Sequence, residues 1–321
     1  MLLIYTTSYD TTVDLLLHRM GGEGCFRFNF DLWRDYKLEV TWDSFRIEDP
    51  TGRSIDERST TKVLWRKPFQ TKELGGEVAI SDQDAYCEEE LWYTLREIVN
   101  LLWAQGKLVL VEPRADSRVG KFVQGRIARR YFPLPEYQFR RGVGPGFFAG
   151  RQVVAKSLSS AAMGDSGDKC VLFATKAGEA ELCPSFPWMV QEYVEADKDI
   201  TVAVVRDRLF AFELSRSAFL GRTIDWRELP IDTTAGDWRP HELPPEYADG
   251  ILRFMQDLSL HFGRLDFLHA DGWYWFLEVN PNGQWAWLDA EGTHGLLDKV
   301  VDEISPFTPC HPIPTSLSMI L

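Results

Sequence analysis

Residues 263–287, GRLDFLHADGWYWFLEVNPNGQWAW, decide the fold of this chain. Polar and apolar side chains alternate over residues 264–268, as they do in a strand with one buried face. Ala270-Asp271-Gly272 is a turn signal, and residues 273–279 return as an apolar strand. The stretch therefore predicts a β-hairpin, and the other motifs of the chain take their places around it.

Four functional side chains share one end of this predicted hairpin. Because side chains two apart on a strand point to the same face, Arg264 and Asp266 point the same way. Glu278 and Asn280 form a second such pair. Strand pairing then gathers two carboxylates and an amide oxygen, which are hard ligands that suit Mg²⁺ when substrate phosphates complete its shell. Arg264 is placed to hold an anion beside the metal. The alternative is an ordinary hairpin whose polar residues face water.

Composition narrows the class of protein. At 321 residues the chain is long enough for two or three domains. A net charge of −13 argues against non-specific binding to nucleic acid or to an anionic membrane, but a small anionic ligand needs only a local basic site. Five scattered cysteines without a CxxC pair indicate reduced thiols in a cytoplasmic protein. The start MLLIYTTSYD lacks the features of a signal peptide, and no apolar run is long enough to predict a membrane span.

Three α/β segments follow one another along the chain. Residues 1–112 contain short strands and a long amphipathic helix over residues 81–105. Residues 113–190 begin with a basic helix and continue as strands, and residues 191–321 hold further strands, a helix and the hairpin. The tail from Ser305 carries four prolines and is predicted to be poorly ordered.

The hairpin also carries a resemblance to a known family. Asp266, followed twelve residues later by Glu278-x-Asn280, resembles the metal-binding signature of the ATP-grasp superfamily. With Gly283-Gln284-Trp285 added, the string is similar to the branch of ligases that macrocyclise ribosomal peptides, the microviridin-type or graspetide ligases. The resemblance covers residues 110–305. It implies an α/β (α+β) ATP-grasp fold, in which an N-terminal pre-ATP-grasp domain precedes a central subdomain and a C-terminal subdomain that carries the metal site.

The resemblance also implies which residues hold ATP. Two lysines, one on the basic helix 117–131 and one ending the strand VVAK, match the family's phosphate-binding pair, although each alone is more typical of a solvated surface. Residues 190–194, VQEYV, resemble the hinge that reads adenine, and the acid five residues later matches the one that accepts ribose hydroxyl hydrogen bonds. A strand exit with a charged turn is the alternative. The implied set is Lys121, Lys156, Gln191, Glu192, Tyr193, Val194 and Asp199.

Two loops and two tryptophans can be interpreted in more than one way. Residues 157–168 lie where the superfamily keeps a mobile flap over the phosphates, and a plain surface loop is the alternative. Residues 142–150 are rich in glycine but fit no phosphate-binding motif, so we interpret them as a loop. Trp285 and Trp287 alternate beyond the hairpin, and packing in the core is a more common use of such residues than lining a peptide-binding wall.

Three arginines are candidates to act on the substrate. Arg216 and the triplet Asp225-Trp226-Arg227 resemble the substrate-facing segment of the peptide-macrocyclising branch. Many relatives carry another arginine two residues after the ribose-binding acid, where this chain has Thr201. Either Arg216, Arg227 or Arg264 replaces it, or the substrate is handled differently.

The function implied by the resemblance is ATP-dependent ligation. Mg²⁺ and ATP are the implied cofactors: a carboxylate is phosphorylated, and a hydroxyl or amine captures the acyl phosphate to give an ester or amide. The implied partner is a ribosomal precursor peptide with a leader and a core rich in Thr, Ser, Asp and Glu, and a homodimer is compatible with this. One rival is a ligase that joins free small acids and amines. A rival of another class is a non-catalytic protein that binds ATP as a regulatory ligand.

Overall fold

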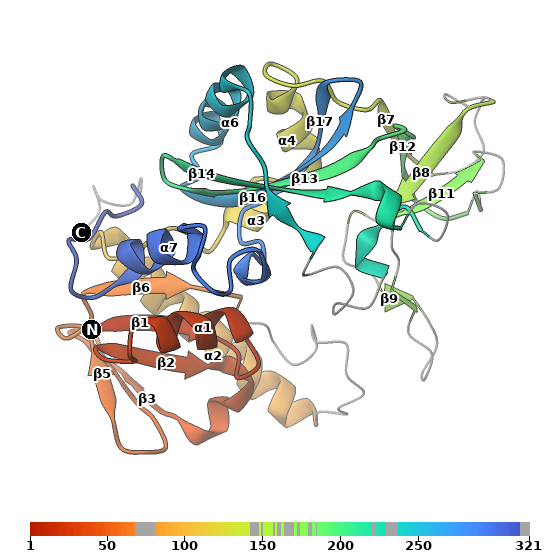
Figure 1. Ribbon diagram of the computed structural model, residues 1–321. Coiled ribbons are helices and arrows are strands. Elements are labelled where there is room, and N and C mark those ends of the chain that lie inside the picture. Colours follow the sequence, from red (N-terminus) through yellow and green to blue (C-terminus); the bar gives the residue numbers. More distant parts are fainter. Residues whose placement is uncertain are drawn as a thin grey trace.

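The computed structural model of this chain describes residues 1–67, 81–141, 148, 150–156, 158, 162–163, 170–171, 174–178, 182–183, 185–219, 223–228 and 237–314. Most of the predicted glycine-rich loop 142–150 and of the predicted flap 157–168 lies outside the described residues. The described residues form an N-terminal α/β region and two antiparallel sheets that lie above it in Figure 1. No helix in the described ranges is long and apolar enough to cross a membrane.

The N-terminal region is organised by a parallel sheet whose strand order is β2-β1-β6. Alternate residues of its central strand face opposite layers: Leu2 and Ile4 pack toward α1, whereas Leu3 and Tyr5 pack toward α2. The serine predicted to begin the long helix does so, because Ser81 Oγ accepts a hydrogen bond from the Asp84 amide at 3.1 Å. The elements are β1 (Leu2–Thr6), α1 (Thr11–Arg19), β2 (Cys25–Asn29), β6 (Lys62–Trp65) and α2 (Asp82–Ala104). A small antiparallel sheet adds β3 (Lys37–Val40), β4 (Phe45–Glu48) and β5 (Ser54–Asp56).

The basic helix predicted over residues 117–131 is two short helices, so that prediction was wrong in extent. The chain leaves helical geometry at Val119 and Gly120, whose ψ angles are 56° and 163°, and Gly120 begins the second helix. A four-stranded antiparallel sheet follows, in the order β11-β8-β12-β7. The bounds are α3 (Ala115–Arg118), α4 (Lys121–Ala128), β7 (Tyr137–Arg140), β8 (Gln152–Lys156), β11 (Thr175–Gly178) and β12 (Trp188–Glu192), with β9 (Ala162–Met163) and β10 (Cys170–Val171) as a separate short pair.

The C-terminal sheet is five-stranded and antiparallel, in the order β15-β14-β13-β16-β17. One face packs on α6 through Val202, Leu265 and Phe254, and the other packs on α7 through Ala203 and Val300. Helix α7 also contacts the N-terminal sheet, so the two sheets enclose one hydrophobic layer (Figure 1). The bounds are β13 (Lys198–Val205), β14 (Arg208–Ser215), β15 (Arg239–Pro240), α6 (Pro245–Asp257), β16 (Phe262–Ala270), β17 (Trp273–Asn280) and α7 (Leu296–Ile304).

The segment after α7 corrects a second prediction. Residues 305–314 are described and packed along the N-terminal region, although the prolines predicted poor order. Ile313 is buried, its amide donates to the Leu108 carbonyl, and its own carbonyl accepts from Trp103 Nε1 at 3.1 Å. Lys62 Nζ donates to Thr308 Oγ1 at 2.9 Å. These contacts come from residues far away in the sequence, so a local count of prolines did not reveal them.

Candidate functional site

A cavity of about 540 Å³ lies between the central and C-terminal sheets. Its volume is within the range of small-molecule sites. All the predicted site residues line it except Glu192, whose carboxylate instead pairs with Arg151 at 3.5 Å. The lining members of that set are Lys121, Lys156, Gln191, Tyr193, Val194, Asp199, Arg216, Arg227, Arg264, Asp266, Glu278 and Asn280.

The predicted hairpin is confirmed and forms the floor of the cavity. Strands β16 and β17 pair so that Asp266 faces Glu278 across the ladder and Arg264 faces Asn280. The register shifts just beyond Asp266, and such a bulge re-aims the neighbouring side chains. The four side chains that the alternating pattern placed together therefore do lie at one end of the sheet.

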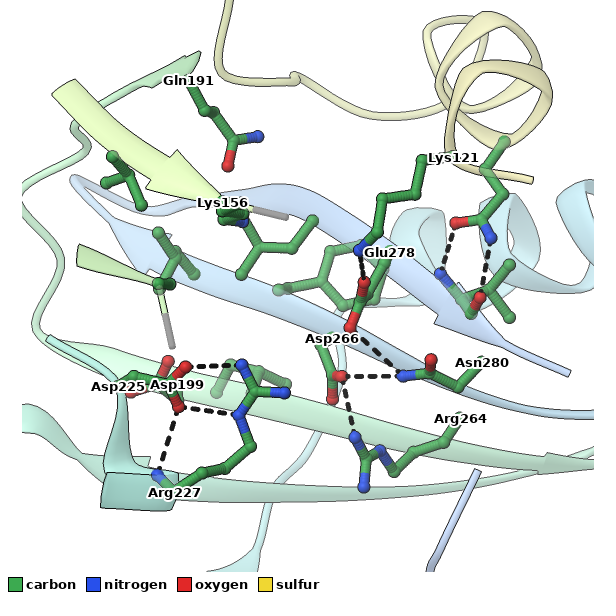
Figure 2. A pocket seen from close by; sticks show the side chains of 18 of the residues that line it. Lys121, Lys156, Gln191, Asp199, Asp225, Arg227, Arg264, Asp266, Glu278 and Asn280 are labelled. Atoms are coloured by element: carbon green, nitrogen blue, oxygen red, sulfur yellow. Dashed lines mark hydrogen bonds and ion pairs between the residues drawn. The ribbon is translucent and has the colours of Figure 1, made fainter. Parts of the chain in front are cut away.

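The acids of this hairpin are held by short polar contacts. Asp266 Oδ2 accepts from Arg264 Nη2 at 3.0 Å and from Asn280 Nδ2 at 3.4 Å, and Asn280 Nδ2 also lies 3.3 Å from Glu278 Oε1. Figure 2 shows Arg264 and Asn280 reaching Asp266 from the same side. Two carboxylates and an amide are an oxygen donor set that fits Mg²⁺ bound together with nucleotide phosphates.

Thr201 supports Asp266, one of the two facing acids of the hairpin, and was not identified as a site residue from the sequence. It lies opposite Asp266 in the β13–β16 ladder, is buried, and donates from Oγ1 to Asp266 Oδ1 at 2.8 Å. The position at which many family members carry arginine thus orients a carboxylate in this chain. Its spacing of two residues from Asp199, which places both on one strand face, was the available signal.

Lys121 and Glu278 form an ion pair across the cavity (Figure 2). Burial alone would raise the pKa of Glu278, but the charge of Lys121 and its hydrogen bond, with Lys156 and Arg227 nearby, lower that pKa to about 2. Helix α4 is fixed beside β17 by Gln124, which exchanges hydrogen bonds of 2.8 and 2.9 Å with the Val279 backbone.

Lys156, at the end of β8, also lines the cavity, and its side chain forms no hydrogen bond or ion pair with another of the residues that the structure describes. Desolvation lowers its pKa to about 8, with Lys121 and Arg227 acting in the same direction and Glu278 against them. The lysine is therefore mostly charged at neutral pH, and no acid within the described part of the chain is bound to it. It is the more available of the two predicted phosphate-binding lysines.

We expect Lys156→Met to weaken binding of a non-hydrolysable ATP analogue more than Lys121→Met does. Because the pKa of Lys156 is about 8, about nine-tenths of it is charged at pH 7 and about one-tenth at pH 9. Wild-type affinity should therefore fall as the pH rises through 8, and Lys156→Met should lose this dependence. Calorimetric titration of each protein with the ATP analogue at pH 7 and at pH 9 measures these affinities. Equal affinities of both variants and the wild type would rule out both assignments.

Two arginines of the cavity are bound to acids of their own. Arg216 is buried, and its Nη1 donates to both carboxylate oxygens of Asp199 at 3.0 and 2.9 Å. Arg227 binds Asp225 through Nε at 2.7 Å and through Nη2. Burial raises the pKa of Asp199 to about 7 against the opposing charge of Arg216, and the acids Asp266 and Asp225 raise it further. Arg216 thus orients the candidate ribose-binding acid.

A cluster of three tryptophans holds the segment that carries Arg227. Trp226 lies 5.5 Å from Trp238 and 5.3 Å from Trp287 between ring centroids, and Trp238 lies 5.2 Å from Trp287. Trp285 is in the hydrophobic core. Trp285 therefore packs in the core, which is the first of the two uses considered for these tryptophans. Trp287 instead anchors a segment of the cavity wall.

Arg66 joins the N-terminal region to the loop after the hairpin, and the sequence did not single it out. Its Nη1 donates to the Asn282 carbonyl at 2.9 Å and to Asn282 Oδ1 at 2.6 Å, while Nη2 binds Gln284 Oε1. Its Nε lies 3.6 Å from Asp10 Oδ2. Gln284 also offers its carbonyl to Arg264 Nη1 at 2.9 Å, so this clamp reaches the β16–β17 hairpin.

We compared the chain with known families, curated proteins and solved structures. Neither a scan against family models nor a search of curated proteins gives a match. The RiPP-associated ATP-grasp ligase of Chryseobacterium gregarium, solved with ADP and a leader and core peptide, is similar with a TM-score of 0.81 and 22% identity over 97% of this chain and 98% of that one. Macrocyclase MdnC of Microcystis aeruginosa, solved with its precursor peptide MdnA, is similar with a TM-score of 0.76. The sequence identity is 20% over 95% of this chain and 99% of that one.

A small-substrate ligase is similar to a lesser degree. D-alanine–D-alanine ligase of Bacillus anthracis gives a TM-score of 0.50 and 14% identity over 94% of this chain and 96% of that one. The likeness thus spans nearly the whole chain in each comparison, including the N-terminal region that the motifs matched only in outline. This chain has the ATP-grasp fold of these solved ligases.

Proposed function

We propose that this protein is an ADP-forming ligase that uses Mg·ATP to activate a carboxylate as an acyl phosphate. A hydroxyl or amine then attacks the acyl carbon and phosphate leaves, which gives an ester or amide. The observation that carries the proposal is the pair of facing acids Asp266 and Glu278 on the cavity floor, with Lys121 paired to Glu278 and Lys156 also lining the cavity. A non-catalytic ATP-binding protein would have no need for this pair.

In this proposal the wall of the cavity holds the nucleotide. Gln191, Tyr193 and Val194 at the end of β12 would take the adenine, and Asp199 the ribose. Lys156 would bind phosphate oxygens as a point charge. Mg²⁺ held by the oxygen ligands of the hairpin would neutralise phosphate charge during transfer. The protein's own contribution is therefore mainly positioning and charge, which suits phosphoryl transfer.

We further propose that the carboxylate belongs to a ribosomal precursor peptide with a leader and a core rich in Thr, Ser, Asp and Glu. The support is the greater similarity to two ligases solved with peptides than to the ligase of free D-alanine. The division into an N-terminal region, residues 1–112, and two subdomains meeting near residue 190 belongs to the same proposal. We also propose that the protein forms a homodimer.

The arginines should differ in their kinetic effects. Arg264 contacts Asp266 directly, so Arg264→Ala should lower turnover at saturating substrate by about a hundredfold, as for a lost charge-stabilising donor. Arg227 lies on the segment beside the tryptophan cluster, and Arg227→Ala should mainly raise the Michaelis constant for the peptide. Steady-state kinetics measure both, with the exposed Arg208→Ala as control. If Arg264→Ala instead raised the Michaelis constant and Arg227→Ala lowered turnover, the roles of the two arginines would be the reverse of those proposed.

The function is tested with a short precursor peptide, rich in Thr, Ser, Asp and Glu, of the kind that a neighbouring small gene would encode. We expect the purified protein to remove one water from that peptide for each bond formed, in the presence of Mg·ATP, as seen by mass spectrometry. One ADP should appear for each water lost. If the wild type instead condenses free amino acids and leaves such peptides untouched, the peptide proposal is wrong and the small-substrate ligase replaces it.

A further inference from the structure

Two helices carry exposed surfaces of opposite charge outside the candidate site. Residues 82–97 hold six acids and one arginine, whereas residues 118–130 hold five basic residues and no acid. The first segment is the N-terminal part of α2, and the second runs from the end of α3 to just beyond α4. In a chain with a net charge of −13, a segment of this kind without an acid favours an anionic partner.

The exposed side of α2 combines acids with tyrosine rings. The opposite side of the helix packs on the N-terminal sheet through buried residues such as Leu95 and Leu102. Helical periodicity places another set together on the side away from the sheet, and every member of it is exposed. We call this set the α2 face: Asp82, Tyr86, Glu89, Glu90, Tyr93 and Glu97. Tyr86 is 64% exposed, and the Arg96 guanidinium stacks on the Tyr93 ring at 4.6 Å, so a tyrosine of this face already binds an arginine.

The exposed side of α4 combines arginines with apolar side chains. The inner side of this helix carries Lys121 into the cavity and binds the Val279 backbone through Gln124. The outer side of the helix and of the turn that ends it is exposed, and we call it the α4 face: Phe122, Val123, Arg126, Arg129 and Arg130. Phe139 of β7 extends this face, because its ring lies 6.2 Å from that of Phe122 and is also exposed. Apolar side chains gathered on a surface in this way are typical of interaction sites.

The charges of both faces are available for a partner. Arg130 pairs with Asp257 at 3.2 Å, but Arg126 and Arg129 form no ion pair or side-chain hydrogen bond with any residue that the structure describes. The four acids of the α2 face likewise have no ion pair within the described part of the chain. Each face therefore presents exposed charges that no described residue neutralises.

The chemistry of the two faces is complementary. Arginine binds carboxylates through paired N–H groups and stacks on aromatic rings, and the α2 face offers both kinds of partner. Arginine, tyrosine and phenylalanine are enriched in protein interfaces and lysine is depleted, and neither face contains a lysine. Helix α4 lies in the upper half of Figure 1 and α2 in the lower half, so one face can meet the other only on a second molecule.

We propose that the α2 face of one protomer binds the α4 face of a second copy of this chain. This inference rests on the homodimer proposed above and gives it an interface. In a two-fold dimer the two copies exchange their faces, so the same contact forms twice and the assembly closes. The arginines of each copy then bind the acids of the other, while the exposed phenylalanine and tyrosine rings pack together between them.

Charge reversal tests this pairing. One variant carries Arg126→Glu with Arg129→Glu, and the other carries Glu89→Arg with Glu90→Arg. In a dimer of either variant alone, like charges lie against each other in both contacts, so association should weaken by about a hundredfold or more. Sedimentation equilibrium at micromolar concentration should therefore find a dimer for the wild type and a monomer for each variant.

An equimolar mixture of the two variants should form a dimer again. In the mixed pair, the native acids of the first variant meet the native arginines of the second, and the introduced charges meet each other with opposite sign. The two variants differ in mass, so native mass spectrometry identifies the heterodimer. Arg208→Glu with Arg239→Glu, at exposed positions of the C-terminal sheet, is the matched control and should dimerise as the wild type does. Thermal melting confirms that each variant is folded.

Three results would overturn the inference. A monomeric wild type would remove the homodimer together with its interface. A dimer of either reversed variant that is as stable as that of the wild type would place the interface elsewhere in the molecule. Monomeric variants that form no heterodimer when mixed would show that the two faces do not bind each other. Because mass is measured and not turnover, none of these results bears on the ligase proposal, which fails separately if no ADP forms with any peptide.

Discussion

Replacing Asp266 with Asn, or Glu278 with Gln, is expected to abolish ADP formation while the protein remains folded. Each change removes one negative oxygen from the facing pair on the hairpin but keeps the shape of the side chain. A bound metal contributes several kcal/mol of charge stabilisation in the transition state, so we expect a loss of at least about a thousandfold. Glu278→Gln also releases Lys121 from its ion pair.

The matched control for these variants is Asp271→Asn. Asp271 is exposed in the turn of the same hairpin, outside the residues that line the cavity, and its positive φ of 51° is readily adopted by asparagine. ADP release in a coupled assay and thermal melting should match the wild type for this variant. Activity of Asp266→Asn or Glu278→Gln within threefold of the wild type would remove the basis for the metal assignment.

Arg66→Met should produce the largest loss of stability among the substitutions considered. Arg66 is only 3% exposed and joins Asp10, Asn282 and Gln284. Removing it leaves the buried Asp10 carboxylate without its cation, and breaking a buried pair in this way costs about 3–5 kcal/mol. Urea unfolding should show this loss, and turnover should fall as well because Gln284 no longer fixes Arg264.

Arg19→Met provides the comparison for this measurement. Arg19 pairs with Asp298 at 2.7 Å and likewise connects the N-terminal region to the C-terminal one, but both side chains are about half exposed. An exposed pair contributes about 1 kcal/mol or less, so this variant should be nearly as stable as the wild type. Similar unfolding free energies for the two variants would mean that Arg66 is not the buried clamp described above.

The hairpin could be predicted from the sequence because its signals are local. Period-two alternation, a turn with Asp-Gly and a bulk of apolar residues specify two paired strands, and the shared face of Asp266, Glu278 and Asn280 follows from strand geometry. The same applies to the long helix with its serine cap. Elements whose stabilising residues lie within a few positions of one another are visible in this way.

The features that were missed depend on residues distant in the sequence. Arg66 binds the loop near Gln284, more than two hundred residues later, and no local pattern connects them. The tryptophan cluster draws on three separate segments. The split of the basic helix at Gly120 had a local signal, since glycine is a poor interior residue in a helix.

Transfer of oxygen from the substrate to phosphate tests the central claim most directly. The peptide carboxylate is labelled with the heavy isotope of oxygen and incubated with the protein and Mg·ATP, and the inorganic phosphate is then analysed by mass spectrometry. If Asp266 and Glu278 hold a metal that serves acyl phosphate formation, each bond formed should deliver one heavy oxygen to phosphate, with ADP as the other product. Unlabelled phosphate, or AMP and pyrophosphate in place of ADP, would contradict the account.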